Sequence, residues 1–132
     1  MSNSTTDIYI PSVGNIKTLE VEAYTDSAYA NKIDQISWDT LEPGKTVNTT
    51  IYIKSVSNVE ITLDIHLTDW VPSNLSKYIT ISWDYDGSSL NPREGIPVTL
   101  MLSASSSDDF IYYLVENEVQ NFNVDVHFVG SA

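Results

Sequence analysis

The chain has 132 residues, which fits one domain of ordinary size. It carries 18 acidic residues against 6 Lys and Arg. The resulting net charge of −12 excludes nucleic acid as the partner, because phosphate binding needs clustered basic residues. Hydrophobic residues make up 42% of the chain, too many for a disordered acidic tail, and the lack of cysteine excludes disulfides and thiolate metal sites.

Apolar and polar residues alternate with period two along much of the chain, and this pattern predicts strands. The clearest case is the segment 59–67, where Glu60, Asp64 and His66 lie on the polar face. No stretch of ten or more residues shows apolar residues at helical spacing. In chain order, the predicted strands are residues 19–23, 47–53, 59–67, 78–83, 96–104 and 119–128.

Strands of this kind, separated by clusters of Gly, Pro, Asn and Ser, are typical of antiparallel sheets that pack face to face. We therefore predict an all-β fold, an immunoglobulin-like antiparallel β-sandwich of about seven strands. A small closed barrel is the competing topology. We expect residues 1–15 to form a polar N-terminal segment and residues 16–130 to form the sandwich domain.

Two segments of the chain resemble each other at an offset of 49 residues, as two equivalent edges of a sandwich or chance similarity between short turn-strand segments would produce. Leu41-Glu42-Pro43-Gly44 precedes the strand at 47–53, and Leu90-Asn91-Pro92-Arg93 precedes the strand at 96–104. Each segment predicts a turn set by proline, followed by a core strand. The second copy departs from the first because Arg93 stands where Gly44 stands in the first.

Two runs carry more apolar side chains than one strand face can bury. The run 110–115 has six apolar or aromatic residues in a row, and the run 51–53 poses the same problem on a smaller scale. One interpretation is structural: a bent strand that crosses between sheets, or tyrosine side chains that cover loops. The other is a surface that binds a protein or a second copy about a two-fold axis. The interface candidates are Tyr52, Ile53, Ile111, Tyr112 and Tyr113.

Polar residues do not converge on any catalytic, cofactor or metal motif in this sequence. His66 and His127 fall on the polar faces of predicted strands, where surface histidines are solvated; they could face each other across a sheet. Asp84-Tyr85-Asp86-Gly87-Ser88 resembles the start of a calcium loop, but the glutamate that would complete such a loop is missing. We therefore interpret it as a turn between strands, and we expect no enzymatic activity and no cofactor.

The chain contains three Asn-x-Ser/Thr sequons, which are typical of an extracellular surface. Their asparagines are Asn3, Asn48 and Asn74. The candidate glycosylation sites are Asn48 and Asn74. Asn48 falls on the face of its predicted strand opposite to Val47 and Ile51, where a sugar has room.

A series of short motifs occurs between residues 16 and 129. The series is Trp38-x-x-Leu41-x-Pro43-Gly44, Ile51-Tyr52-Ile53, Ile61-Thr62-Leu63, Asp69-Trp70-x-Pro72 and Ile79-Thr80-Ile81-Ser82-Trp83. It resembles a β-sandwich domain common in archaeal envelope proteins, and within that group the soluble domain of the FlaF family of archaellum stator proteins.

This resemblance implies a non-catalytic anchor. FlaF-type proteins carry an N-terminal membrane helix, and their sandwich lies outside the cytoplasm, between the cell membrane and the surface layer. There the domain dimerises, binds surface-layer protein and gives the other archaellum motor components a fixed point. This chain starts with a polar segment, so we expect a membrane anchor to have been removed before it.

Two other functions fit the same pattern. One is a filament or coat subunit of pilin type; built by strand donation, it would lack one strand and polymerise, whereas an anchor domain would stop at dimers. The other is a carbohydrate-binding module, in which Trp70 and the tyrosines would stack on sugars.

Overall fold

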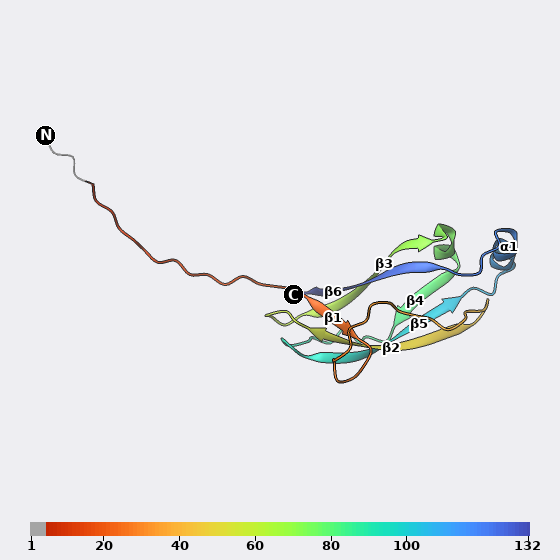
Figure 1. Ribbon diagram of the computed structural model, residues 1–132, viewed down its shortest axis with the longest axis horizontal. Helices are drawn as coiled ribbons and strands as arrows, with labels where there is room; N and C mark the ends of the chain where they lie inside the picture. Colours follow the sequence, from red (N-terminus) through yellow and green to blue (C-terminus); the bar gives the residue numbers. More distant parts are fainter. Residues whose placement is uncertain (1–4) are drawn as a thin grey trace.

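A computed structural model describes residues 5–132 as six strands and two short helices (Figure 1). The elements are β1 (Val21–Tyr24), β2 (Thr46–Ser55), β3 (Thr62–Val71), the 3-10 helix η1 (Ser73–Lys77), β4 (Ile79–Trp83), β5 (Gly95–Ala104), α1 (Asp108–Glu116) and β6 (Asn123–Ser131). Each of the six strands overlaps one predicted from the alternation of the sequence.

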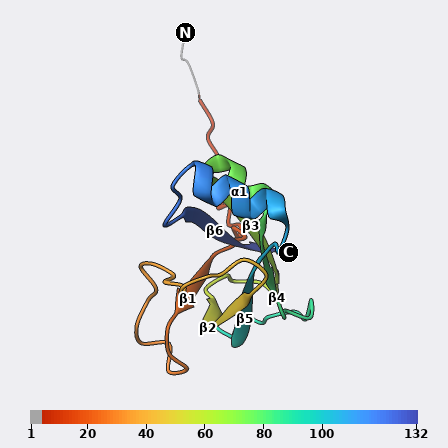
Figure 2. The same cartoon turned by 90° about the vertical axis from the view of Figure 1, so that its right-hand side faces the viewer.

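The strands form two antiparallel sheets that lie one over the other (Figure 2). One sheet has four strands in the order β1-β2-β5-β4, and the other has only β3 and β6. The predicted all-β sandwich is confirmed, with six strands in place of about seven.

The core lies between the two sheets and follows from the alternation of the central strands. Ile51 and Ile53 of β2 and Leu100 of β5 point into it and are almost fully buried, as are Ile61 and Leu90. A second cluster lies beneath α1 and is centred on Leu75, Ile79, Leu102, Ala104 and Phe110.

The apolar run at 110–115 forms α1, so the prediction of a bent strand there was wrong. The hydroxyl of Ser107 caps the helix by accepting a hydrogen bond from the Phe110 amide (3.3 Å), and Asp108 and Asp109 lie in the first turn, where the helix dipole favours negative charge. Helical spacing buries Phe110 and turns Ile111 outward. Six apolar residues in a row are thus divided between the core and the solvent.

Ile53 must be withdrawn from the interface candidates, because its side chain is 0% exposed in the core between the sheets. Strand alternation explains this placement: Ile53 shares a face with the buried Ile51, and Tyr52 points to the other side of the sheet.

The 49-residue repeat is a structural repeat as well. β2 and β5 pair so that Thr50 lies opposite Thr99, its own equivalent, and the two hydroxyls are 3.1 Å apart. The turn before each strand caps the end of the other strand: the Gly44 amide donates to the Ala104 carbonyl, and the Arg93 amide donates to the Ser55 carbonyl, both at 3.0 Å. The central strand pair therefore has an approximate two-fold axis.

We predict that Arg93→Gly stabilises the domain. Arg93 takes the left-handed conformation (φ 69°) that its equivalent Gly44 takes (φ 78°), and only glycine adopts it without steric cost. The free energy of unfolding in urea should rise by about 0.5–1 kcal/mol. The matched Gly44→Ala variant should lose about 1 kcal/mol or more, because a side chain there is strained and its Cβ would lie 3.2 Å from the Ser106 Cβ. A less stable Arg93→Gly variant would contradict this reading of the turn.

We predict that Ile53→Ala lowers the free energy of unfolding by about 2–5 kcal/mol, since it opens a cavity in the core. Ile111→Ala is the control: that side chain is 43% exposed on α1, so the change should stay within about 0.5 kcal/mol. Equal losses in the two variants, measured by urea denaturation, would contradict the placement of Ile53.

Candidate protein-binding groove

β6 has a free edge. Among the residues that the structure describes, its only strand partner is β3, and across its other edge lies the connection between β1 and β2 (Figure 2). Within residues 5–132, no backbone hydrogen bond joins this outer edge of β6 to another segment. An unpaired edge of this kind can accept an additional strand.

A groove of about 1020 Å³ runs along this free edge, between β6 and the connecting segment 33–43. Its lining is mixed, and its apolar part comes from Ile36, Trp38, Leu41, Phe122, Val124 and Val126 on the two sides and from Leu75, Ile79 and Phe110 of the second core cluster. Like the edge of β6, the backbone of residues 34–41 makes no hydrogen bond to other backbone in the described chain. The groove is therefore bounded on both sides by polypeptide with unused backbone donors and acceptors.

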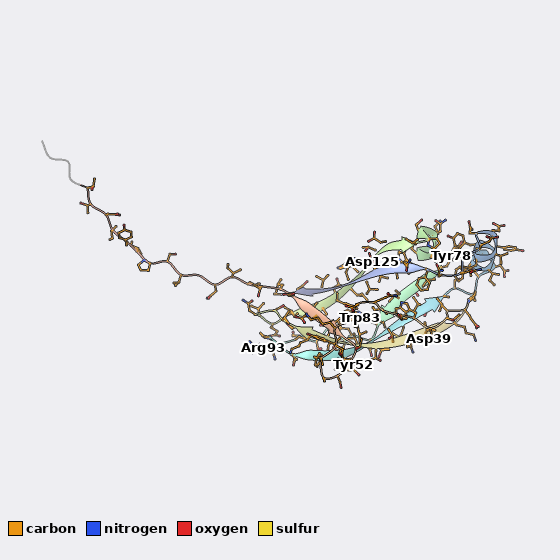
Figure 3. The ribbon with its side chains drawn as sticks, viewed as in Figure 1. Asp39, Tyr52, Tyr78, Trp83, Arg93 and Asp125 are labelled. Carbon is orange, nitrogen blue, oxygen red and sulfur yellow. The ribbon has the colours of Figure 1, made fainter. Side chains whose placement is uncertain are left out.

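The groove carries mostly negative charge. Asp125 of β6 and Asp39 of the connecting segment line it from opposite sides (Figure 3), and Asp34 adds a third carboxylate. His127 also lines it, and its Nε2 lies 2.7 Å from the Thr68 hydroxyl. His66 is the register partner of His127, as the sequence allowed, but its Nε2 lies 3.5 Å from an Asp64 carboxylate oxygen. A ligand of this groove must be compatible with acidic residues on both sides.

Residues 16–20 extend β1 beyond its last ladder pair and hold the start of the chain to the loop after β2. The Asn58 side chain donates to the Ile16 carbonyl (2.7 Å) and accepts from the Thr18 amide (2.9 Å), and the Val56 amide donates to the Glu20 carbonyl (3.0 Å). The residues before them, 5–15, project away from the sandwich (Figure 1). We call residues 5–15 the N-terminal arm.

The N-terminal arm is fully exposed and rich in apolar side chains. Ile8, Tyr9, Ile10 and Val13 are 78%, 88%, 77% and 98% exposed. We described this segment from its sequence as polar and did not consider it as a binding element; the signal that could have identified it is the Ile-Tyr-Ile run followed by Pro11. The groove was missed for a different reason, since Ile33, Ile36 and Trp38 show no strand alternation.

The remaining interface candidates do not form one surface. Ile111 and Tyr112 are exposed on α1 together with Val115, and Tyr113 packs against Tyr78 with 5.7 Å between ring centroids. Tyr52 belongs instead to the outer face of the four-stranded sheet and meets the edge of Tyr29 at 6.2 Å (Figure 3). Two separate candidate surfaces follow from these residues.

The other sequence candidates lie on the surface. Asn48 on β2 and Asn74 on η1 are exposed, and Asn3 lies outside the described residues. Trp70 is half-buried and stacks on Phe122 at 6.5 Å between centroids, which covers one ring face that a sugar would need.

The segment that resembles a calcium loop uses its carboxylates locally. Asp86 accepts a hydrogen bond from the Ser88 amide (2.9 Å), which lowers the pKa of the Asp86 carboxyl, and Asp84 accepts one from the Thr99 amide (2.8 Å). Gly87, at φ 84°, completes the turn. In the part of the chain that the structure describes, no group of three or more potential metal-binding side chains is found.

An ionic cluster stabilises the β1 end of the four-stranded sheet. Glu22 accepts a hydrogen bond from the Tyr24 hydroxyl and pairs with Lys32 at 3.0 Å. The Tyr24 hydrogen bond is the main cause of a lowered pKa of Glu22, with a smaller contribution from Lys32, and the pKa of Tyr24 and Lys32 is raised in turn, chiefly by Glu22.

We predict that Glu22→Gln weakens the dependence of stability on pH in acid. A lowered pKa in the folded state means that the ionised Glu22 stabilises the fold above its unfolded-state pKa, and that this contribution disappears as the pH falls through the lowered value. The variant should be less stable than the parent at pH 7 and should approach it at the acid end of a series of thermal melts. High salt should shrink the difference, because the pair is accessible to solvent. A constant difference at every pH would contradict the assignment.

Comparison with known proteins identifies no relative: no family model, curated protein or solved structure matches this chain. Neither helix in residues 5–132 has the length and apolarity to cross a membrane.

Proposed function

We propose that this chain is a non-catalytic, protein-binding domain of the archaeal cell envelope and that its main binding surface is the groove along β6. The observation that carries the proposal is the free edge of β6 beside an apolar groove. Strand addition uses the backbone donors and acceptors of an edge for affinity and the adjacent pockets for specificity. A peptide segment that enters the groove as a strand would meet both requirements.

The specific role implied by the FlaF resemblance is that of an anchor. In this role a membrane helix precedes the sandwich in the full-length protein, and the domain lies between the membrane and the surface layer. There it dimerises and binds surface-layer protein, giving the archaellum motor a fixed point. The two-layer core is suited to bearing load, because the buried side chains of both sheets pack as one unit. The exposed face of α1, with Ile111 and Tyr112, is then the candidate dimer contact.

A second candidate role, a filament or coat subunit, is favoured by one observation. The smaller sheet has two strands and leaves one edge of β6 unpaired, which is the feature expected of a subunit that receives a strand from a neighbour. Both roles use the same groove: surface-layer protein fills it in the anchor role, and a strand of a neighbouring subunit fills it in the filament or coat role.

We predict that Val126→Asp in the groove weakens the binding of surface-layer protein by at least about tenfold, since it places a charge on an apolar wall of the binding surface. Val129→Asp is the matched control: it adds the same charge to the same strand at an exposed position outside the groove and should change the affinity by less than about threefold. Titration calorimetry with the surface-layer protein of the source organism gives both affinities. Unchanged binding by a folded Val126→Asp variant would refute the groove as the binding surface.

A further inference from the structure

We propose that the groove of each molecule is filled by the N-terminal arm of a second copy, which adds as a strand to the free edge of β6. This inference rests on the proposed function, because it takes the same groove as the binding surface and names its occupant. The chain carries both parts of the interaction: an open groove and an exposed apolar segment that fills no groove of its own.

The arm has the character of a strand that lacks a partner. Ile8 and Ile10 lie two residues apart and therefore share one face, and the small residues Ser12 and Gly14 follow on that face. β-branched side chains fit a pleated surface, whereas Tyr9 on the other face keeps its hydroxyl in water. In the described chain, no hydrogen bond ties residues 5–15 to the sandwich. Ile8 and Ile10 are therefore the residues that enter the groove.

The chain's own geometry directs the arm to a different molecule. The bonds from Asn58 and Val56 hold residues 16–20 in line with β1, so the arm leaves along the strand direction and away from the groove beside β6 (Figure 1). In each copy the arm is therefore exposed and does not fill the groove of the same molecule.

The lengths of the two parts match. The groove is lined by residues 123–128 of β6, a span of about 17–20 Å at ~3.4 Å per residue. The arm, at residues 5–15, reaches about 36 Å when extended, so it can cross the groove and still leave residues to separate two sandwiches. Pro11 is compatible with this placement when its nitrogen faces away from β6, since an added strand has one unpaired side.

The charges of the two parts are compatible as well. The groove is lined by the carboxylates of Asp34, Asp39 and Asp125, and the molecule as a whole carries −12. Residues 8–15 contain no charged side chain, so they can enter without repulsion.

Arm and groove are different surfaces of the molecule, so their contact is heterologous: it gives a closed dimer where two copies exchange arms, a ring where the rotation closes, and an open chain otherwise. In an open chain, each added copy offers a new free arm and a new open groove. We propose the open chain, which of the two roles above corresponds to the filament or coat subunit; a mass that stops at the dimer would instead indicate exchanged arms and the anchor role.

The test measures the molar mass of the full chain by light scattering over a wide range of concentrations, at about 0.15 M salt to screen repulsion between acidic copies. We expect the mass to rise with concentration beyond the dimer. Ile10→Asp should weaken association at least about tenfold, because it puts a charge into the groove, whereas Val13→Asp adds the same charge on the other face of the arm and should weaken it less than about threefold. Val126→Asp and its control Val129→Asp make the same comparison on the groove side.

Two further measurements separate the alternatives. A synthetic peptide of residues 5–16 should compete with the arm and lower the mass, and in the assembled protein the outward amides of β6 should exchange with deuterium more slowly than in dilute solution. A monomer at every concentration would overturn the proposal. A monomer whose arm amides are protected from deuterium exchange would also overturn it, because the arm would then fill the groove of its own molecule. If Ile10→Asp and Val126→Asp leave association intact, the proposal is also overturned, because a contact through the face of α1 would then drive association.

The Ile10→Asp variant also separates this inference from the proposed function, because its groove is intact and its arm is disabled. If the parent chain does not self-associate but Ile10→Asp binds surface-layer protein through the groove, the arm proposal falls and the binding surface stands. If Val126→Asp leaves both kinds of binding unchanged, both proposals fall.

Discussion

The unpaired edge of β6 is the constraint on which the proposed function of this molecule depends. Backbone donors and acceptors must find partners in protein or in water, and a strand edge presents a whole row of them in one direction. In the four-stranded sheet, β2 and β5 are paired on both sides, whereas β1 and β4 are edge strands. Within residues 5–132 the smaller sheet has two strands, so both are edge strands, and β6 faces the segment 33–43, which forms no ladder with it. Of these edge strands, β6 contributes a continuous run, residues 123–128, to the lining of the groove.

The central pair of strands explains how the rest of the fold remains stable beside an open edge. β2 and β5 are each ten residues long, pair over nearly their whole length, and bury Ile51, Ile53, Val98, Leu100 and Leu102. Each strand end is closed by the turn that precedes its partner, through backbone bonds at Gly44 and Arg93. These backbone bonds close both ends of the β2–β5 pair, so the strand pairing of the larger sheet does not depend on the smaller sheet. The groove can therefore stay open while the core stays packed.

Local pattern predicted the strands well and the arrangement of their edges poorly. The alternation at 47–53 and 59–67 identified β2 and β3, since a half-buried strand must show it. The same alternation indicates that Ile53 belongs to the core, because Ile53 shares the face of Val47 and Ile51. The order of strands in a sheet, in contrast, is fixed by contacts between distant residues, and nothing in the sequence of β6 indicates that its outer side has no partner.

The helix α1 shows a different limit. Six consecutive apolar residues fit a buried strand and a helix equally well, and the signal that distinguishes them is the Ser107-Asp108-Asp109 start, which caps a helix. The candidate groove could not be inferred for a similar reason: the segment 33–43 has neither period, although it supplies Ile36 and Trp38 to the wall. Irregular segments take their place from the surfaces they cover, which local pattern does not encode.

The way residues 16–20 are bonded has a mechanical consequence. They continue the register of β1, with Glu20 beside Val56 and Thr18 beside Asn58, so the arm leaves parallel to the strands. Hydrogen bonds between antiparallel strands lie across that direction. A pull on the arm would therefore shear these bonds together instead of unzipping them one after another, and tension would be shared along the whole β1 edge of the domain.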